Sequence, residues 1–294
     1  MRDMPAQSLK SGFRLTSGDV EILTWVYQLR LSTIEHLVAL TGRERTRVNR
    51  RLVRMLERKY LYRRRSSVYD KYVYTLDKQA IPILMEQGVT PTETFSVEVK
   101  RLREFKDLFL KHAIMLTDIH TTLELASRCS PIKLIDWREG KTRVWDNVWV
   151  YEKGEREKKP VRPDAFLTLE DTRRPEGQNR RHIFLEADRS TTNNERFQKK
   201  IKAYHAYIDQ GLHTKKYGIK SARVVTVTRT EARAVNLCAA SRGVLPSKDA
   251  QFYYYASMKH FSFESPEQIL DDIFISPKDF DTDMRYSLMP PLAK

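Results

Sequence analysis

Three acidic residues have a spacing that suits a metal site. Asp164 follows Pro163, and Glu186 and Asp188 end a second apolar run. If that run is a β-strand, positions 186 and 188 share one face, together with Phe184. Two carboxylates on a strand and a third on its neighbour can hold a hard cation such as Mg²⁺, which can activate water at a phosphodiester. The same spacing also fits acids that solvate strand ends or pair with nearby arginines, so spacing alone leaves both interpretations open.

A second group of charged residues is basic. Residues 43–65 contain eleven Lys or Arg and two Glu, a net charge of +9. At 100° per residue the arginines of this segment fall mainly on one side of a helix, and Val48, Leu52, Met55 and Leu56 fall on the other. This pattern predicts a helix with one face packed in a core and one arginine face, which matches a phosphate backbone better than plain solvent.

The flanking elements predict a winged helix-turn-helix. A helix-start signal at Thr16 precedes an apolar helix, and Ser32 is placed to cap a second short helix that ends at Gly42. After the arginine helix, residues 60–76 are typical of a hairpin with Ser66 and Ser67 at its tip. In this plan the third helix enters the major groove, and the hairpin contacts the backbone or the minor groove.

The expected DNA contacts follow from this plan. Arg and Asn suit bidentate base contacts, which are expected in the first half of the helix, although each such residue also fits a phosphate contact. The predicted DNA-binding residues are Arg43, Arg45, Arg47, Asn49, Arg50, Arg54, Arg58, Arg63, Arg64, Arg65 and Lys71.

Composition supports a nucleic-acid partner. The 294 residues carry a net charge of +15, which favours a polyanion, double-stranded DNA first. The sequence has no apolar run of about 18 residues and no apolar signal core at its start, so we expect a cytoplasmic protein without a membrane span. Cys129 and Cys238 lack metal-ligand spacing; we expect buried thiols rather than a disulfide, and zinc fingers are excluded.

Two domains are expected from the length. A loop-like stretch at 88–96 places the boundary near residue 95, giving a winged helix over 1–95 and a second domain over 96–294. The second domain begins with a helix over 100–128, and the stretch 154–160 is expected to be an exposed loop. Strands are predicted at 132–137, 142–151, 161–169, 181–190, 222–230 and 251–257, and helices at 193–210 and 231–241. Residues from about 260 onward look like a loose tail or a cap. The fold class is therefore α+β with a mixed central sheet.

Three segments carry a family resemblance. VRPDAFLTL (161–169), FLEADRST (184–191) and FQKKIKAY (197–204), behind a winged helix, resemble the replication-relaxation family. Its members are plasmid and mobile-element proteins linked to replication and to relaxation of plasmid DNA. The pattern of Pro-Asp followed by Glu-x-acid also resembles the PD-(D/E)xK nuclease superfamily. Over about residues 15–240, the resemblance implies a restriction-endonuclease-like core with Asp164 and Glu186 at the metal positions.

The sequence departs from the superfamily at one position. The lysine expected two residues after Glu186 is Asp188, and other superfamily members move this lysine to the next helix. Lys200 lies nearer the apolar face of that helix than Lys199, so it is the candidate to act on the water nucleophile or the scissile phosphate. An acid of the preceding long helix, Glu124 or Asp118, is a further candidate.

Two functions remain open at this stage. The first is a DNA-binding protein of a plasmid or other mobile element that acts in replication or mobilisation, with Mg²⁺-dependent DNA nicking or cleavage as a metal-dependent endonuclease. The second is a transcriptional or copy-number regulator whose nuclease-like domain is inert and serves dimerisation or partner binding. A homodimer and replication or mobilisation proteins are the expected protein partners.

Overall fold

The computed structural model describes residues 15–89, 104, 106–140, 144–152, 154–190 and 192–289. The chain folds as two compact units, Met1–Thr117 and Asp118–Lys294. The boundary expected near residue 95 lies outside the described residues.

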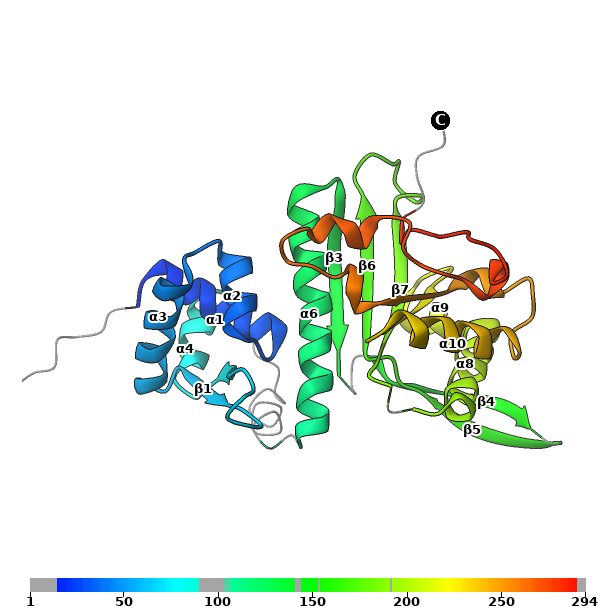
Figure 1. The fold of residues 1–294 in the computed structure, drawn as a ribbon, viewed down its shortest axis with the longest axis horizontal. Helices are drawn as coiled ribbons and strands as arrows, with labels where there is room; N and C mark the ends of the chain where they lie inside the picture. The colour runs from blue at the N-terminus through cyan, green and yellow to red at the C-terminus, as the bar shows by residue number, and fades with distance from the viewer. Residues whose placement is uncertain are drawn as a thin grey trace, which may run out of the picture. The chain divides into compact units, whose positions relative to one another are not determined.

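The N-terminal unit has the order of elements of a winged helix (Figure 1). β1 and β2 form an antiparallel hairpin, and the apolar faces of α1, α2 and α3 enclose a core that includes Leu23, Leu37 and Leu52. The elements are α1 Ser17–Leu29, α2 Ile34–Thr41, α3 Arg45–Glu57, β1 Leu61–Arg64, β2 Val73–Leu76 and α4 Ala80–Glu86.

Local signals explain where these helices begin and end. Thr16 and Asp19 form a capping box at the start of α1, as the sequence predicted. α2 starts one residue later than expected, because Thr33 and His36 form its capping box while the backbone of Ser32 pairs with Tyr74. Gly42 adopts φ 64° at the end of α2, a left-handed conformation that glycine accepts without steric cost.

The helix α6, Asp107–Cys129, begins in the first unit and continues into the second. The second unit contains a five-stranded mixed sheet in the order β3-β6-β7-β8-β9. β6 runs antiparallel to both neighbours, and β7, β8 and β9 are parallel. The remaining elements are β3 Ile132–Glu139, β4 Asp146–Glu152, β5 Glu155–Val161, β6 Ala165–Asp171, β7 Arg180–Asp188, α8 Asn194–Asp209, α9 Leu212–Tyr217, β8 Arg223–Thr228, α10 Glu231–Arg242 and β9 Tyr253–Ser257.

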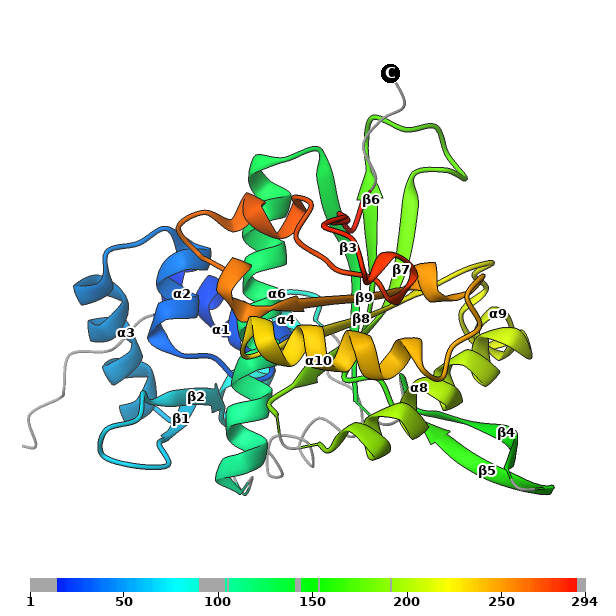
Figure 2. The ribbon, with the colours of Figure 1, turned by 45° about the vertical axis from the view of Figure 1, so that its right-hand side comes forward.

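Helices cover both faces of this sheet. Phe166 and Phe184 pack in one cluster with side chains of α8 and α10, and the two helices also contact each other (Figure 2). Trp137 pairs in register with Leu167, so it lies on the face opposite Phe166. There it stacks on His120 of α6, with ring centroids 4.1 Å apart. The mixed central sheet expected from the sequence is therefore confirmed as a layered α+β unit.

Two expectations need correction, and one open alternative is decided. The stretch 154–160 is mostly a strand rather than a loop, because β5 pairs along its whole length with β4 in a separate hairpin. The sequence carries no strand signal here, because both faces of an exposed two-stranded ribbon can carry charged residues and the ribbon needs no alternation of apolar and polar residues. Of the two alternatives for the region from about residue 260, the described residues up to 289 agree with the cap: they form turns and short 3-10 helices, in which Phe274 is buried and Ile275 bridges to Tyr255 of β9. Both cysteines are free thiols, but only Cys238 is buried.

Candidate functional site

The outer face of α3 is strongly basic. Val48, Leu52 and Met55 are buried against the core, as predicted. The side chains exposed on the other side include Arg45, Thr46, Arg47, Asn49, Arg50, Arg54 and Arg58. Within the described residues, Arg47, Arg50 and Arg54 form no ion pair with an acid. They border a hollow of about 460 Å³ beside the start of α1, so their positive charge is available to a ligand in solvent.

Two arginines of the same segment point toward the protein instead. Arg43, a predicted DNA contact, pairs with Glu21 of α1 at 2.5 Å. Arg51, which the prediction omitted, holds the buried carboxylate of Asp19 with two hydrogen bonds. Burial opposes ionisation of Asp19, but the bonds from Arg51 and Thr16 more than offset it and lower the pKa of this carboxyl. These pairs attach α3 to α1.

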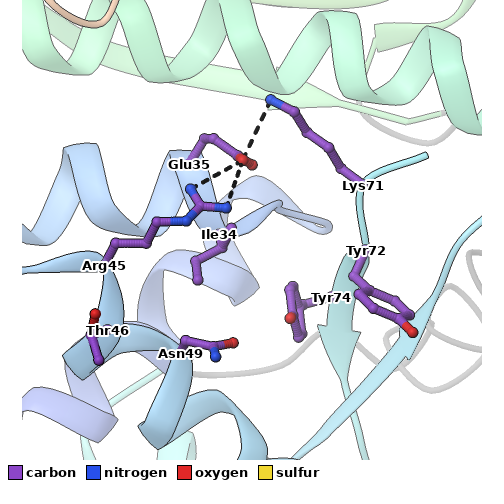
Figure 3. Close-up of a pocket in the computed structure, with 8 residues that line it drawn as sticks. All are labelled: Ile34, Glu35, Arg45, Thr46, Asn49, Lys71, Tyr72 and Tyr74. Carbon is purple, nitrogen blue, oxygen red and sulfur yellow. Dashed lines mark hydrogen bonds and ion pairs between the residues drawn. The ribbon is translucent and has the colours of Figure 1, made fainter. Parts of the chain in front are cut away.

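A second hollow of about 330 Å³ lies between α3 and the wing, which is the β1–β2 hairpin with its connecting loop (Figure 3). Glu35 of α2 accepts hydrogen bonds from both Nη atoms of Arg45 at 3.2 Å, and its carboxylate lies 3.5 Å from Nζ of Lys71. Thr46 and Asn49 line the same hollow. Glu35 therefore positions one cation of the helix and one of the wing at the rim of a polar hollow.

The wing orients its arginines through an aromatic ring. The guanidinium groups of Arg63 and Arg65 lie over the ring of Tyr72, at 4.4 and 4.8 Å from its centroid. Arg64 points to Asp107, 3.4 Å away. Two of the three predicted wing arginines thus stack on the same tyrosine ring, and the third pairs with an acid of the protein.

The acidic cluster of the second unit is built around Glu186. This side chain is 3% exposed on β7, and its two carboxylate oxygens accept hydrogen bonds from Lys200 and from the hydroxyl of Tyr204, both on α8. Asp164, just before β6, accepts a 2.9 Å hydrogen bond from the backbone N–H of Ala187. Asp164, Glu186 and Lys200 come from three separate segments of the sequence. The pairing of β6 with β7 and the packing of α8 bring them together, as expected.

The environment changes the proton affinity of this cluster. Burial raises the pKa of Glu186 to about 7, with the Asp164 charge acting in the same direction and Lys200 opposing it. Burial also disfavours a charged Lys200, but the neighbouring carboxylates of Glu186, Asp164 and Asp188 more than offset this and raise its pKa. Lys200 is therefore a firmly charged cation beside the two carboxylates.

Asp188 and Glu124 have other partners. The carboxylate of Asp188 accepts hydrogen bonds from Arg233 of α10 at 3.1 and 3.3 Å and from the backbone N–H of Ser190 at 2.6 Å. Glu124 lies 3.6 Å from His120. In the part of the chain that the structure describes, no group of three or more His, Cys, Asp or Glu could hold a metal ion. The expected three-carboxylate arrangement is therefore not assembled, and Asp164 and Glu186 remain as an oxygen donor pair.

Sequence comparison identifies the family. The family model described as replication-relaxation matches residues 23–222 of the chain. The chain belongs to the replication-relaxation family. The match covers both the winged helix and the acidic cluster, and it confirms the resemblance seen in the sequence.

Other comparisons of this replication-relaxation protein are less extensive. A DNA complex of a Lactococcus lactis ZitR variant shares 18% identity, covering 37% of this chain and 75% of that chain, with a TM-score of 0.24. The structure titled as a zinc-responsive MarR family member, Lactococcus lactis ZitR, shares 20% identity over 37% and 76% of the two chains, also with a TM-score of 0.24. At this level neither similarity carries an argument about function. No curated protein matches the chain.

Sequence reasoning missed three partners in these sites. Tyr204 is four residues after Lys200, so the helical repeat places both on one face of α8 and gave a signal for it. Arg233 and Arg51 gave no such signal, because their acids lie 45 and 32 residues away in the chain.

Among the described helices of this family member, none is long and apolar enough to cross a membrane.

Proposed function

We propose that this replication-relaxation protein binds double-stranded DNA through α3 and the wing, and acts in the replication or mobilisation of a plasmid or other mobile element. One observation carries the proposal: α3 exposes a row of arginines, Arg47, Arg50 and Arg54, that pair with no acid of the described residues. Neutralising phosphates releases counterions, and such a row supplies several contacts of this kind.

The geometry divides the expected contacts. Thr46, Arg47, Asn49 and Arg50 lie in the N-terminal half of α3, where helix-turn-helix proteins read base edges in the major groove. We assign Arg54 and Arg58 to phosphate contacts, and Arg63 and Arg65 to the DNA backbone beside the wing. Four of the expected contacts, Arg43, Arg45, Arg64 and Lys71, already pair with an acid, so a phosphate contact from any of them would replace that acid.

A gel-shift titration tests this proposal. The double variant Arg47→Ala/Arg50→Ala should bind duplex DNA much more weakly, because it removes two exposed cations of α3. The slope of log K against log salt should fall by about 0.9 for each of the two arginines that neutralises a phosphate. The matched control Lys215→Ala/Lys220→Ala removes two exposed lysines of the other unit and should bind as the wild type does. Equal binding by the two double variants would exclude α3 as the DNA-reading helix.

A second candidate function is Mg²⁺-dependent nicking of DNA. The sheet order, with the second strand antiparallel and the next strands parallel, supports a restriction-endonuclease-like core of the PD-(D/E)xK type. The cluster of Asp164, Glu186 and Lys200 supports the activity. Asp164 and Glu186 are oxygen donors that fit Mg²⁺, which supplies Lewis-acid activation of water when bound. Lys200 would orient a water or stabilise charge on the scissile phosphate, while the carboxylate of Asp188 is paired with Arg233.

Supercoiled plasmid distinguishes this candidate from the inert-regulator alternative. The wild type should convert supercoiled to open-circular DNA with Mg²⁺ or Mn²⁺ and not with EDTA, while Asp164→Ala should be inactive yet bind duplex DNA normally. Binding without metal-dependent nicking would instead support a transcriptional or copy-number regulator whose second unit serves dimerisation or partner binding. The molar mass in solution, measured by light scattering, tests the proposed homodimer.

A further inference from the structure

A basic groove with aromatic residues runs between α8 and the β4–β5 hairpin. Its volume is about 370 Å³, and it is lined by residues of both elements. Figures 1 and 2 both show the hairpin projecting beyond the sheet with α8 beside its base. None of these residues belongs to the winged helix or to the acidic cluster, so the function proposed above leaves them unused.

The walls of the groove are fixed in place. Tyr207 of α8 donates a 3.0 Å hydrogen bond to Asp146 at the start of β4, and Gln210 donates a 2.7 Å bond to the backbone carbonyl of Trp149. Val148 is completely buried in the cluster that also contains residues of α8. The hairpin base is therefore anchored, and a ligand meets a formed groove.

Two aromatic rings of β4 are exposed at the rim of this groove. Tyr151 is 77% exposed and Trp149 is 43% exposed, although aromatic side chains usually bury their surface. Both residues border the groove. Alternation places their rings on the face of β4 opposite Val148 and Val150, which pack toward α8, so the rings stand at the outer rim of the groove. Arg156 of β5 lies over the ring of Trp149, 4.5 Å from its centroid. Flat rings backed by a cation form a stacking platform of the kind that unpaired bases use.

The charge of the groove has one sign. Lys159, Lys199 and Lys202 line it, and no Asp or Glu of the described residues does. Glu157 and Glu195 pair with the first two lysines, at 2.5 and 2.8 Å, but these acids are 56% and 75% exposed. Exposed pairs of this kind contribute little stability, so a phosphate can replace the acid at small cost. Lys202 has no ion pair among the described residues.

We propose that this groove binds a segment of single-stranded DNA. Phosphates would follow the lysines of α8 and β5 inside the groove, and bases would turn outward to stack on Trp149 and Tyr151 at its rim. Duplex DNA fits the rings poorly, because its bases are already stacked on one another. The groove is also continuous in sequence with the acidic cluster: β5 is followed within three residues by Asp164, and α8 carries Lys200. The proposal rests on the proposed function in taking DNA as the ligand, but it assigns a different strand state to a different surface.

The experiment measures fluorescence anisotropy of a labelled oligo(dT) of about 12 nucleotides. The full chain carries Arg47→Ala/Arg50→Ala throughout, so that the winged helix does not dominate binding. In this background Trp149→Ala/Tyr151→Ala should weaken oligo(dT) binding by at least about 10-fold, since loss of one base stack costs about 5- to 100-fold. Trp149→Phe/Tyr151→Phe keeps both rings and should retain most of the affinity.

Two single lysine substitutions, one inside the groove and one outside it, test the role of charge. Lys202→Ala should reduce both affinity and its salt dependence, whereas Lys215→Ala, an exposed lysine of α9 outside the groove, should change neither. Unlabelled duplex of equal length should compete more weakly than unlabelled oligo(dT). Equal affinity of the Trp149→Ala/Tyr151→Ala protein and its parent would overturn the proposal, and so would equal competition by duplex. Failure of the α3 proposal is seen separately, in the duplex gel shift.

Discussion

Adjacent arginines on α3 are expected to have opposite roles, and substituting each one with alanine separates them. Arg51 is 18% exposed and holds the carboxylate of Asp19, which is 1% exposed, while Arg50 is exposed to solvent. Arg51→Ala removes the partner of a buried charge. Removing one member of a buried pair costs about 3–5 kcal/mol, and the partial exposure of Arg51 places the expected loss near the lower end, about 3 kcal/mol.

The assay is unfolding by urea and by heat, followed by circular dichroism, together with a duplex gel shift. A loss of about 3 kcal/mol corresponds to a melting shift of roughly 12–24 °C for a unit of this size. Arg50→Ala should unfold within about 0.5 kcal/mol of the wild type, because it is an exposed substitution, and should lose DNA affinity. Arg51→Ala should bind DNA as the wild type does at temperatures where it remains folded. Equal stability of the two variants, or normal DNA binding by Arg50→Ala, would refute the division of roles.

The pH dependence gives an independent check of the same pair. The pKa of Asp19 lies below its ordinary value of 3.8 in the folded protein. A carboxyl with a lowered pKa contributes stability above its unfolded pKa and loses it as pH falls through the folded pKa. The difference in stability between the wild type and Arg51→Ala should therefore be complete at pH 7 and become smaller below about pH 4. A difference that stays constant to about pH 2 would show that the Asp19 charge has no part in it.

Three further predictions concern single residues. Asn49→Ala should relax base preference at one position of the site by about 5- to 100-fold without changing the salt slope, measured on a panel of duplex variants. Glu186 has a pKa of about 7 in the folded protein and 4.5 in the unfolded chain, so between these pH values the folded state binds a proton that the unfolded state has lost. The free energy of unfolding should therefore rise as pH falls from about 8 to about 5 in the wild type, and this rise should be absent in Glu186→Gln. Arg233→Ala leaves the Asp188 carboxylate, 6% exposed, without its charged partner. Urea unfolding should show a stability loss of about 3 kcal/mol, and adding Asp188→Asn should recover part of it.

Local patterns in the sequence were sufficient for the winged helix. The 3.6-residue repeat of Val48, Leu52 and Met55 predicted which face of α3 is buried, because a helix places its side chains by local geometry alone. The same reasoning predicted that Phe184 and Glu186 share a face of β7 and that Lys200, not Lys199, lies toward it. The pairing of β4 with β5 escaped prediction, since an exposed ribbon of charged residues has no apolar period.

The sequence by itself determined the fold class, the basic face of α3, and the candidates Asp164, Glu186 and Lys200. Only the tertiary structure decided which charges remain available to a ligand. Arg43, which the sequence predicted to contact DNA, instead pairs with an acid of α1. Arg51 and Arg233, for which the sequence predicted no role, hold the buried carboxylates of Asp19 and Asp188. The physical reason is that periodicity depends on neighbours a few residues apart, whereas an ion pair depends on which distant segment the packing of helices and sheet brings within about 4 Å.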